Sequence, residues 1–449
     1  MFVKDKQFYK TFVTLTAMMA VQNLLAFSVN LADNIMLGRY SETSIAAASL
    51  VNQIQYLLQM ISVAGIGTGA MAMISQYRGK GETEPIRRII ALTMKFAVVT
   101  GFLFFAVTFF FPRTVISLMT DQPAVSEEGV IYLRLMCFTY LVFPPQSALV
   151  MALRGVKIVS VGPVISAVSL VSNIILNWIF IYGNLGAPEM GIRGAAIATL
   201  ISRVLELSIV LVYVRFFDKK LHIRLLSFFK PDAYYLADYS KAAFPVIASG
   251  ASWGMGTIMQ TVILGHLTES VIAANSVATV VFQILGVYAL GACSTSGVMM
   301  GNIIGAGKTE LVRPYARTFQ LLFVINGLIT SLVLLLARDF VLRFYILSPE
   351  TRELARVFIT ILCVTVVFTS YEFPVESGII LGGGDTRYAF IVDTLFIWLW
   401  VLPLSALSAF VFRFPPLVTF ILLKSDQVLK CIPNSIVVNR YRWIRNLTR

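Results

Sequence analysis

Long apolar stretches follow one another along almost the whole chain, and they limit its fold more than any other feature. A helix needs about 20 mainly apolar residues to cross the hydrocarbon core of a bilayer. Nine uncharged stretches approach or exceed that length, namely Thr11–Ala32, Thr43–Tyr77, Phe96–Pro112, Leu135–Leu153, Ile158–Pro188, Ala242–Gly265, Ser270–Gly307, Thr318–Ala337 and Thr394–Phe412. Three further stretches contain charges, namely Ile192–Val214, Val357–Leu381 and Phe414–Ile432. The pattern predicts an all-α polytopic membrane protein with twelve transmembrane helices, because the strands of a membrane barrel would be about ten residues long with alternating polarity.

The composition argues against a soluble protein. Of the 449 residues, 57% are hydrophobic and only 13% are charged, whereas about 25% of the residues of an ordinary soluble domain are charged. The net charge of +13 would suit a nucleic-acid partner. In a membrane protein, however, the positions of the basic residues matter more than their sum, because cytoplasmic loops collect Lys and Arg.

The distribution of Lys and Arg predicts the topology. If the N-terminus is cytoplasmic, 25 of the 36 basic residues lie on the cytoplasmic side and nine on the other side. We therefore expect both termini to be cytoplasmic in a multi-pass protein of the plasma membrane. The basic surplus then faces anionic lipid, so the expected partners are the lipid bilayer and a small organic substrate, with no nucleic acid. We expect the protein to be a monomer.

The chain contains an internal repeat. Three motifs recur in register at offsets of 226 to 228 positions: Gly79–Glu84 with Gly305–Glu310, Leu37–Gly38 with Leu264–Gly265, and Leu153–Gly155 with Leu381–Gly383. Each half holds six expected spans, an even number, so the two halves share one orientation. The repeat predicts two six-helix bundles, residues 1–225 and 226–449, related by a pseudo-two-fold axis along the membrane normal. Two such lobes are a common basis for alternating access in transporters.

Several short motifs resemble the multidrug and toxic compound extrusion (MATE) family of cation-coupled exporters. They are DNIMLGR at 33–39, LRG at 153–155, NIILN at 173–177, GAAIAT at 194–199, LGGGDTR at 381–387 and WIRNLTR at 443–449. The similarity extends over nearly the whole chain. It implies export of drugs or metabolites, driven by the inward flow of protons or sodium ions, with no bound cofactor.

Asp33 is the first candidate for coupling, because an ionisable group inside a bilayer is costly and is retained for function. It lies six residues before Arg39, about 9 Å from the outer helix end at the rise of an α-helix. The resemblance assigns Asp33, Asn173, Asn177 and Thr199 to a cation or proton site, which is also where a sodium ion would bind. Family members with the most developed site have an acid in place of Asn177. A lone carboxyl group suits proton carriage, because protonation removes its charge.

Glu372 and Glu376 are the candidates of the second half. They are four residues apart around Pro374, on one helix face, and two carboxylates this close would hardly both ionise in a low dielectric. Some members of the resembling family bind the cation with an acid of this helix and a glutamate of the seventh. Trp253 stands near the position of that glutamate, and the stretch 245–256 has no acid, so the resemblance does not extend to a sodium site there.

The remaining intramembrane charges are expected to be structural. Arg203 and Glu206 are three residues apart and can pair on one helix. Asp393 is expected to serve packing. Only Arg203 is basic deep within an expected span. The span 414–432 is the weakest of the twelve, and its lysines are counted on the cytoplasmic side.

These features predict a secondary active antiporter that exports small amphipathic compounds in exchange for protons, less readily for sodium ions. One alternative is a lipid-linked saccharide flippase of the same superfamily, which would need a cationic cavity for phosphates. Another is an intramembrane enzyme, but neither a metal-binding cluster nor a Ser/His pair is visible in the sequence. The expectation is therefore a transporter and not an enzyme.

Overall fold

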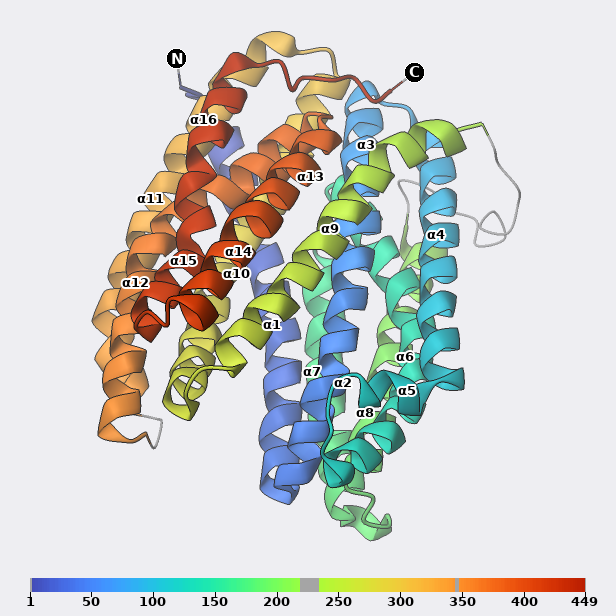
Figure 1. Ribbon diagram of the computed structural model, residues 1–449. Helices are drawn as coiled ribbons and strands as arrows, with labels where there is room; N and C mark the ends of the chain where they lie inside the picture. Colours follow the sequence, from blue (N-terminus) through green and yellow to red (C-terminus); the bar gives the residue numbers. More distant parts are fainter. Residues whose placement is uncertain (1, 219–233, 344–346, 449) are drawn as a thin grey trace. The chain divides into compact units, whose positions relative to one another are not determined.

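The computed structural model describes residues 2–218, 234–343 and 347–448, and helices dominate it (Figure 1). In chain order the segments are α1 (Lys6–Tyr40), α2 (Glu42–Gln59), η1 (Met60–Gly67), α3 (Thr68–Lys80), α4 (Thr83–Phe110), α5 (Pro112–Ser117), α6 (Pro123–Gly155), α7 (Val161–Tyr182), η2 (Asn184–Gly186), α8 (Ile192–Val212), η3 (Tyr213–Phe217), α9 (Leu236–Gly265), α10 (Glu269–Gly305), α11 (Thr309–Leu342), α12 (Pro349–Phe373), η5 (Pro374–Ile380), α13 (Thr386–Thr394), η6 (Leu395–Val401), α14 (Leu402–Ala406), η7 (Leu407–Val411), α15 (Pro416–Leu429) and α16 (Cys431–Arg440). The η segments are short stretches of wider π-helix, except η2, which is a tighter 3₁₀ turn.

Ten helical segments of the described chain are long and apolar enough to cross a bilayer. Each of the twelve expected spans overlaps a described helix. The helices are mostly longer than the apolar runs, because their first and last turns carry the charged residues that border each run. The all-α polytopic membrane fold is confirmed.

The last two expected spans are less regular than the sequence suggests. Residues 394–412 alternate between π- and α-helical turns from η6 to η7, a stretch that contains Pro403, which has no backbone N–H to donate. The expected span 414–432 is divided at Lys430, where α15 ends and α16 begins, and α16 continues to Arg440.

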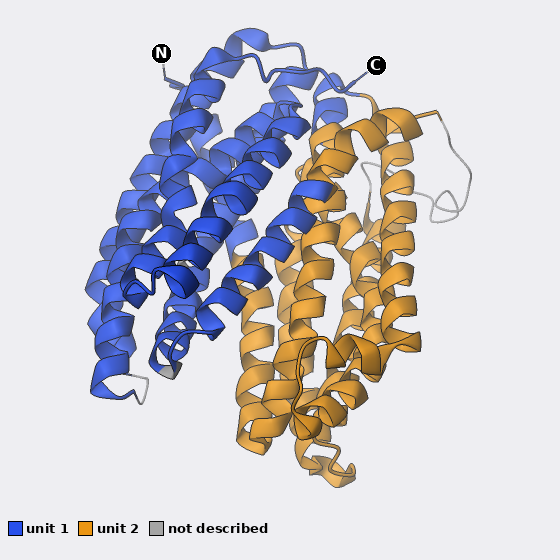
Figure 2. Cartoon of the chain, viewed as in Figure 1, with its two compact units in different colours: residues 1–20, 75–81, 248–449 blue, residues 21–74, 82–247 orange. Residues whose placement is uncertain are grey.

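The chain forms two compact units (Figure 2). Unit 1 comprises residues 1–20, 75–81 and 248–449, and unit 2 comprises residues 21–74 and 82–247. The lobe boundary expected between residues 225 and 226 falls in 219–233, outside the described residues, so the division into lobes 1–225 and 226–449 stays a prediction.

Unit 2 has a core of small and aromatic side chains around α6. Ala47 and Ala48 of α2 and Ala195 and Ala196 of α8 are fully buried in it. Small side chains at helix contacts let helix backbones approach closely within a membrane. This packing places α1, α7 and α8 where their polar side chains meet in the interior.

Unit 1 includes the first turns of α1 because of aromatic packing. Phe8 and Phe12 lie against Phe319 of α11, with ring centroids 5.1 and 5.5 Å apart, and all three are buried. Trp443, after α16, is completely buried in the same cluster. The two ends of the described chain are thus fixed to one core.

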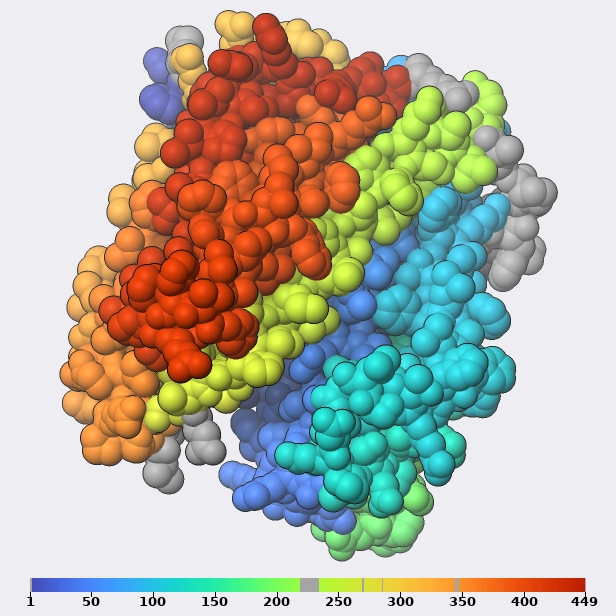
Figure 3. Space-filling view, in the orientation of Figure 1, coloured from blue at the N-terminus to red at the C-terminus, as the bar shows by residue number. Residues whose placement is uncertain are grey.

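Large apolar side chains also cover outer surfaces, as a lipid-facing protein requires. In α11, Leu328, Leu332 and Leu336 are exposed at the four-residue spacing of one helix face. Figure 3 shows α13 to α16, in orange to red, as a continuous surface of unit 1. Leu399 and Phe412 in this part of the chain are also exposed.

The ends of α3 and α10, which carry repeated motifs, cross each other within unit 1. A Cβ added to Gly79 would lie 2.0 Å from the Asn302 carbonyl oxygen, and one added to Gly305 would lie 1.8 Å from the Gln76 carbonyl oxygen. Gly79 and Gly305, like Gln76 and Asn302, are 226 positions apart. The contact is therefore reciprocal, as a two-fold relation between these two helix ends produces.

Candidate functional site

The four residues expected at the first site come together inside unit 2. Asp33 lies on α1, Asn173 and Asn177 on α7, and Thr199 on α8, and all four are buried. The Asn177 side-chain amide donates to the Asp33 carboxylate at 2.5 Å and to the Asn173 amide oxygen at 3.2 Å. Thr199 lies close enough to interact with the same carboxylate.

Three polar atoms of this cluster have no hydrogen-bond partner among the described residues. They are the Asn173 amide nitrogen, the Asn177 amide oxygen and the Thr199 hydroxyl. A buried polar atom that is left unpaired costs about 1–3 kcal/mol, so such atoms usually mark a place for water, an ion or a proton. A carboxylate, two amides and a hydroxyl are ligand types that hard cations accept. The residues fit either a proton or a sodium ion.

Arg203 does not form an ion pair with Asp33. Its guanidinium pairs with Glu206 on the same helix at 2.9 Å, as the three-residue spacing predicts, and lies 5.2 Å from the Phe143 ring centroid. The charge of Arg203 still reaches Asp33 electrostatically. Glu206 thus neutralises Arg203, and the Asp33 carboxylate accepts its hydrogen bond from the neutral amide of Asn177.

Glu372 and Glu376 are both buried inside unit 1, Glu372 at the end of α12 and Glu376 in η5. Asn434 of α16 donates to the Glu376 carboxylate at 3.0 Å and more weakly to the Glu372 backbone carbonyl at 3.4 Å. The wide π-helical turn that begins at Pro374 carries Glu376, and such turns are frequent at functional sites. The expected acid pair thus lies in the interior of its unit.

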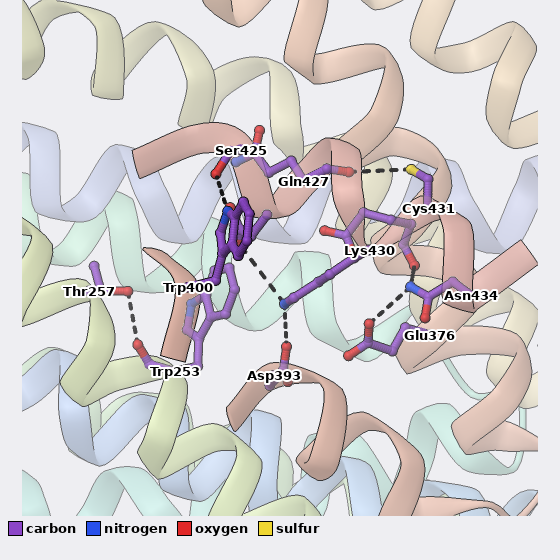
Figure 4. A network of polar contacts seen from close by, with 12 residues as sticks. Trp253, Thr257, Glu376, Asp393, Trp400, Ser425, Gln427, Lys430, Cys431 and Asn434 are labelled. Atoms are coloured by element: carbon purple, nitrogen blue, oxygen red, sulfur yellow. Dashed lines mark hydrogen bonds and ion pairs between the residues drawn. The ribbon is translucent and has the colours of Figure 1, made fainter. Parts of the chain in front are cut away.

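Lys430 is the residue of this region that the sequence analysis missed. It is only 1% exposed, and its ammonium lies 2.6 Å from Asp393 and 3.8 Å from Asp426. Figure 4 shows Lys430 reaching to Asp393, with Asn434 turned to Glu376. The Ser249 hydroxyl donates to the second oxygen of Asp393 at 2.6 Å.

One expectation is corrected here. Lys430, which was counted with the surface charges of the cytoplasmic side, is buried inside unit 1. The signal was present in the sequence, since Lys424, Asp426 and Lys430 interrupt an apolar run. Asp393, expected to serve packing, holds an ion pair at the centre of this acid cluster.

Comparison with known proteins identifies the family. The sequence model of the MatE family matches residues 19–179 and again residues 245–407. The chain belongs to the MatE family. The second match begins 226 and ends 228 positions after the first, the offsets of the internal repeat.

Named relatives and solved structures agree with this assignment. The chain is 23% identical to the probable multidrug resistance protein NorM of Thermotoga maritima, over 86% of this chain and 82% of that protein. It is also 23% identical to the multidrug resistance protein NorM of Photobacterium profundum, over 88% and 86%. A mutant form of the Vibrio cholerae MATE transporter VcmN superposes with a TM-score of 0.87 at 18% identity, covering 98% of both chains. This MatE protein is therefore a membrane transporter and not an enzyme.

Proposed function

We propose that this MatE protein is an antiporter that exports small amphipathic organic compounds in exchange for protons. The observation that carries the proposal is the buried Asp33 carboxylate, bonded to the neutral amide of Asn177. Relatives of the protein are named as multidrug resistance proteins. These names support drugs, dyes or metabolites as the substrate class.

Proton exchange follows from the chemistry of Asp33. A carboxylate in a membrane interior is costly, and protonation removes that cost. Taking up or releasing a proton therefore changes the free energy with which α1 packs against α7 and α8. A conformational change that exposes Asp33 alternately to the two sides would link proton entry to substrate exit. Asn173, Asn177 and Thr199 supply the polar surroundings of the carboxyl group in both protonation states.

The position of the protein in the cell is part of the proposal. We propose a monomer in the plasma membrane with both termini cytoplasmic, and no cofactor beyond the coupling ion. The side of the membrane on which the C-terminus lies can be measured with a cysteine introduced near the C-terminus. The cysteine is labelled from outside intact cells and again after permeabilisation. Labelling only after permeabilisation is expected, and labelling of intact cells would reverse the topology.

Proteoliposomes with separately imposed gradients test the coupling. We expect a proton gradient, but not a sodium gradient, to drive transport of an organic dye such as ethidium. Asp33→Asn should abolish the proton-driven flux, whereas Asp121→Asn, which removes an exposed carboxylate of the same half, should leave it intact. Flux driven only by sodium would make Asp33 a sodium site, and unchanged flux in Asp33→Asn would reject Asp33 as the coupling residue.

The flippase alternative gains no support from half-buried Arg203 or from buried Lys430. A phosphate-bearing lipid needs free cationic groups, but Arg203 is paired with Glu206 and Lys430 with Asp393. Lys430 is also closed off from the surface of its unit.

A further inference from the structure

Asp393 has both of its carboxylate oxygens occupied by side chains. Lys430 approaches one oxygen at 2.6 Å, and the Ser249 hydroxyl donates to the other at 2.6 Å. Both charged residues are at least nine-tenths buried. A buried charge persists only when it is paired and hydrogen-bonded, so this ion pair fixes Lys430 in its charged form beside Asp393.

The surroundings of the Lys430 ammonium are those of a monovalent cation site. Asp426 lies 3.8 Å away, and the centroid of the Trp253 ring lies 5.3 Å away, within the range of a cation–π contact. Glu372 and Glu376 are near enough to interact with it electrostatically. Two carboxylates and an aromatic face thus surround a positive charge that belongs to the chain itself.

The internal repeat gives Lys430 a counterpart with a different partner. Lys430 is 227 positions after Arg203, and Asp426 is 227 positions after Thr199, so each half has a base at the same position of the repeat. Arg203 turns to Glu206 on its own helix, and Asp33 is left with an amide. Lys430 instead pairs with an acid on another helix, Asp393.

We propose that Lys430 is the resident cation of the acid cluster Asp393, Glu376 and Asp426, and that it determines ion specificity by excluding sodium from this half of the transporter. The ammonium already provides the positive charge that the carboxylates need. A sodium ion would have to displace a covalently attached cation from an Asp393 oxygen 2.6 Å away and an Asp426 oxygen 3.8 Å away. The role of Lys430 in ion coupling rests on the proposed function. The predicted effect on sodium binding does not, because binding can be measured on purified protein without transport.

Neutralising Lys430 is the direct test. Lys430→Gln leaves Asp393 and Asp426 without their counter-charge, so a small cation that prefers oxygen ligands can bind at these carboxylates. Lys430→Arg keeps the charge. Lys424→Gln is the matched control, because Lys424 is on α15, which ends just before Lys430, and is near Asp426, but lies over the Phe282 and Phe420 rings.

The measurement is the thermal unfolding midpoint of the full-length protein in detergent, in sodium chloride and in choline chloride at equal ionic strength. All variants carry Asp33→Asn, which removes the candidate cation site of the other half. The unfolding midpoint of Lys430→Gln should be about 2 °C or more higher in sodium chloride than in choline chloride, because a ligand that binds only the folded state stabilises that state. The Lys430→Arg, Lys424→Gln and Asp33→Asn proteins should show no difference. Adding Asp393→Asn to Lys430→Gln should abolish the sodium effect.

Two results would overturn the inference. One is a sodium effect that depends on Asp393 while Lys430 is intact, and the other is a folded Lys430→Gln protein that does not respond to sodium. If Lys430→Gln folds only when purified in sodium chloride, sodium has replaced the ammonium, whereas failure to fold in both salts contradicts the inference. Failure of the proposed function is recognised separately, as proton-driven flux that persists in Asp33→Asn proteoliposomes.

Discussion

At the scale of single residues, Asn177 controls the environment of Asp33. Its amide donates to Asp33 and to Asn173, so it orders the carboxylate between α1 and α7. A hydrogen bond to a charged group is worth about 1.5–3 kcal/mol. Loss of this donor therefore changes the balance between the charged and the protonated carboxyl group, which is the balance that proton coupling uses.

Asn177→Leu is expected to lower proton-driven dye flux about tenfold or more, because the charged form of Asp33 loses its donor. Initial rates in proteoliposomes measure this. Ser172→Ala on the same helix removes a hydroxyl that bonds only to backbone carbonyls of α7 and should transport normally. Equal rates in the two variants would show that Asn177 does not act on Asp33.

Residue pairs within one helix were predictable, and pairs between helices mostly were not. The spacings of Asn173 with Asn177 and of Arg203 with Glu206 place each pair on one helix face, and the structure joins both. Lys430 and Asp393 are 37 positions apart on different helices, and no local spacing relates them. The meeting of Asp33 with α7 and α8 was expected only from resemblance to a family.

At the scale of helices, the crossing of α3 and α10 depends on glycine. The Gln76 carbonyl fills the space that a side chain on Gly305 would need. We expect Gly305→Ala to destabilise the protein by about 1–3 kcal/mol, the usual cost of overpacking. The measurement is the amount of protein that remains monodisperse after heating in detergent.

Gly286→Ala on the same helix is the matched control, because a Cβ there meets no atom within 4 Å. Alanine also favours helix over glycine, so this variant should be as stable as the parent or more so. If both variants lost the same amount of monodisperse protein on heating, the α3–α10 contact would not be the cause of the loss.

Helix boundaries were predictable where apolar runs end in charges, and less so where charges are buried. Lys430 was expected on the cytoplasmic side of the weakest span, but it is buried and paired with Asp393. Pro403 and Pro374 mark the regions where regular α-helix gives way to π-helical turns, although the sequence alone did not specify that geometry.

At the scale of the whole molecule, the account assigns proton exchange to Asp33, whereas in the other half Lys430 is already paired with Asp393. Exchange of one proton for one monovalent cation moves no net charge, whereas exchange for a zwitterion moves one charge inward. Each charge moved is worth about 2.3 kcal/mol per 100 mV. The membrane potential should therefore act on one substrate class and not on the other.

Right-side-out vesicles with an imposed potassium potential test this charge balance. An inside-negative potential of 100 mV should change the steady-state gradient of a zwitterionic fluoroquinolone about 50-fold. It should leave the gradient of tetraethylammonium, a monovalent cation, unchanged. A strong effect on tetraethylammonium would require more than one proton per cycle and a second coupling site.

The exchange of a proton on Asp33 for substrate can be measured most directly without a membrane. Ethidium is added to purified protein in weakly buffered detergent solution at a mildly acidic pH, where Asp33 holds a proton before the dye binds, and a pH indicator records the protons released while fluorescence records binding. The account predicts about one proton released for each ethidium bound, and none from an Asp33→Asn protein that still binds the dye. Undiminished proton release from Asp33→Asn, or ethidium binding that releases sodium in place of protons, would contradict it.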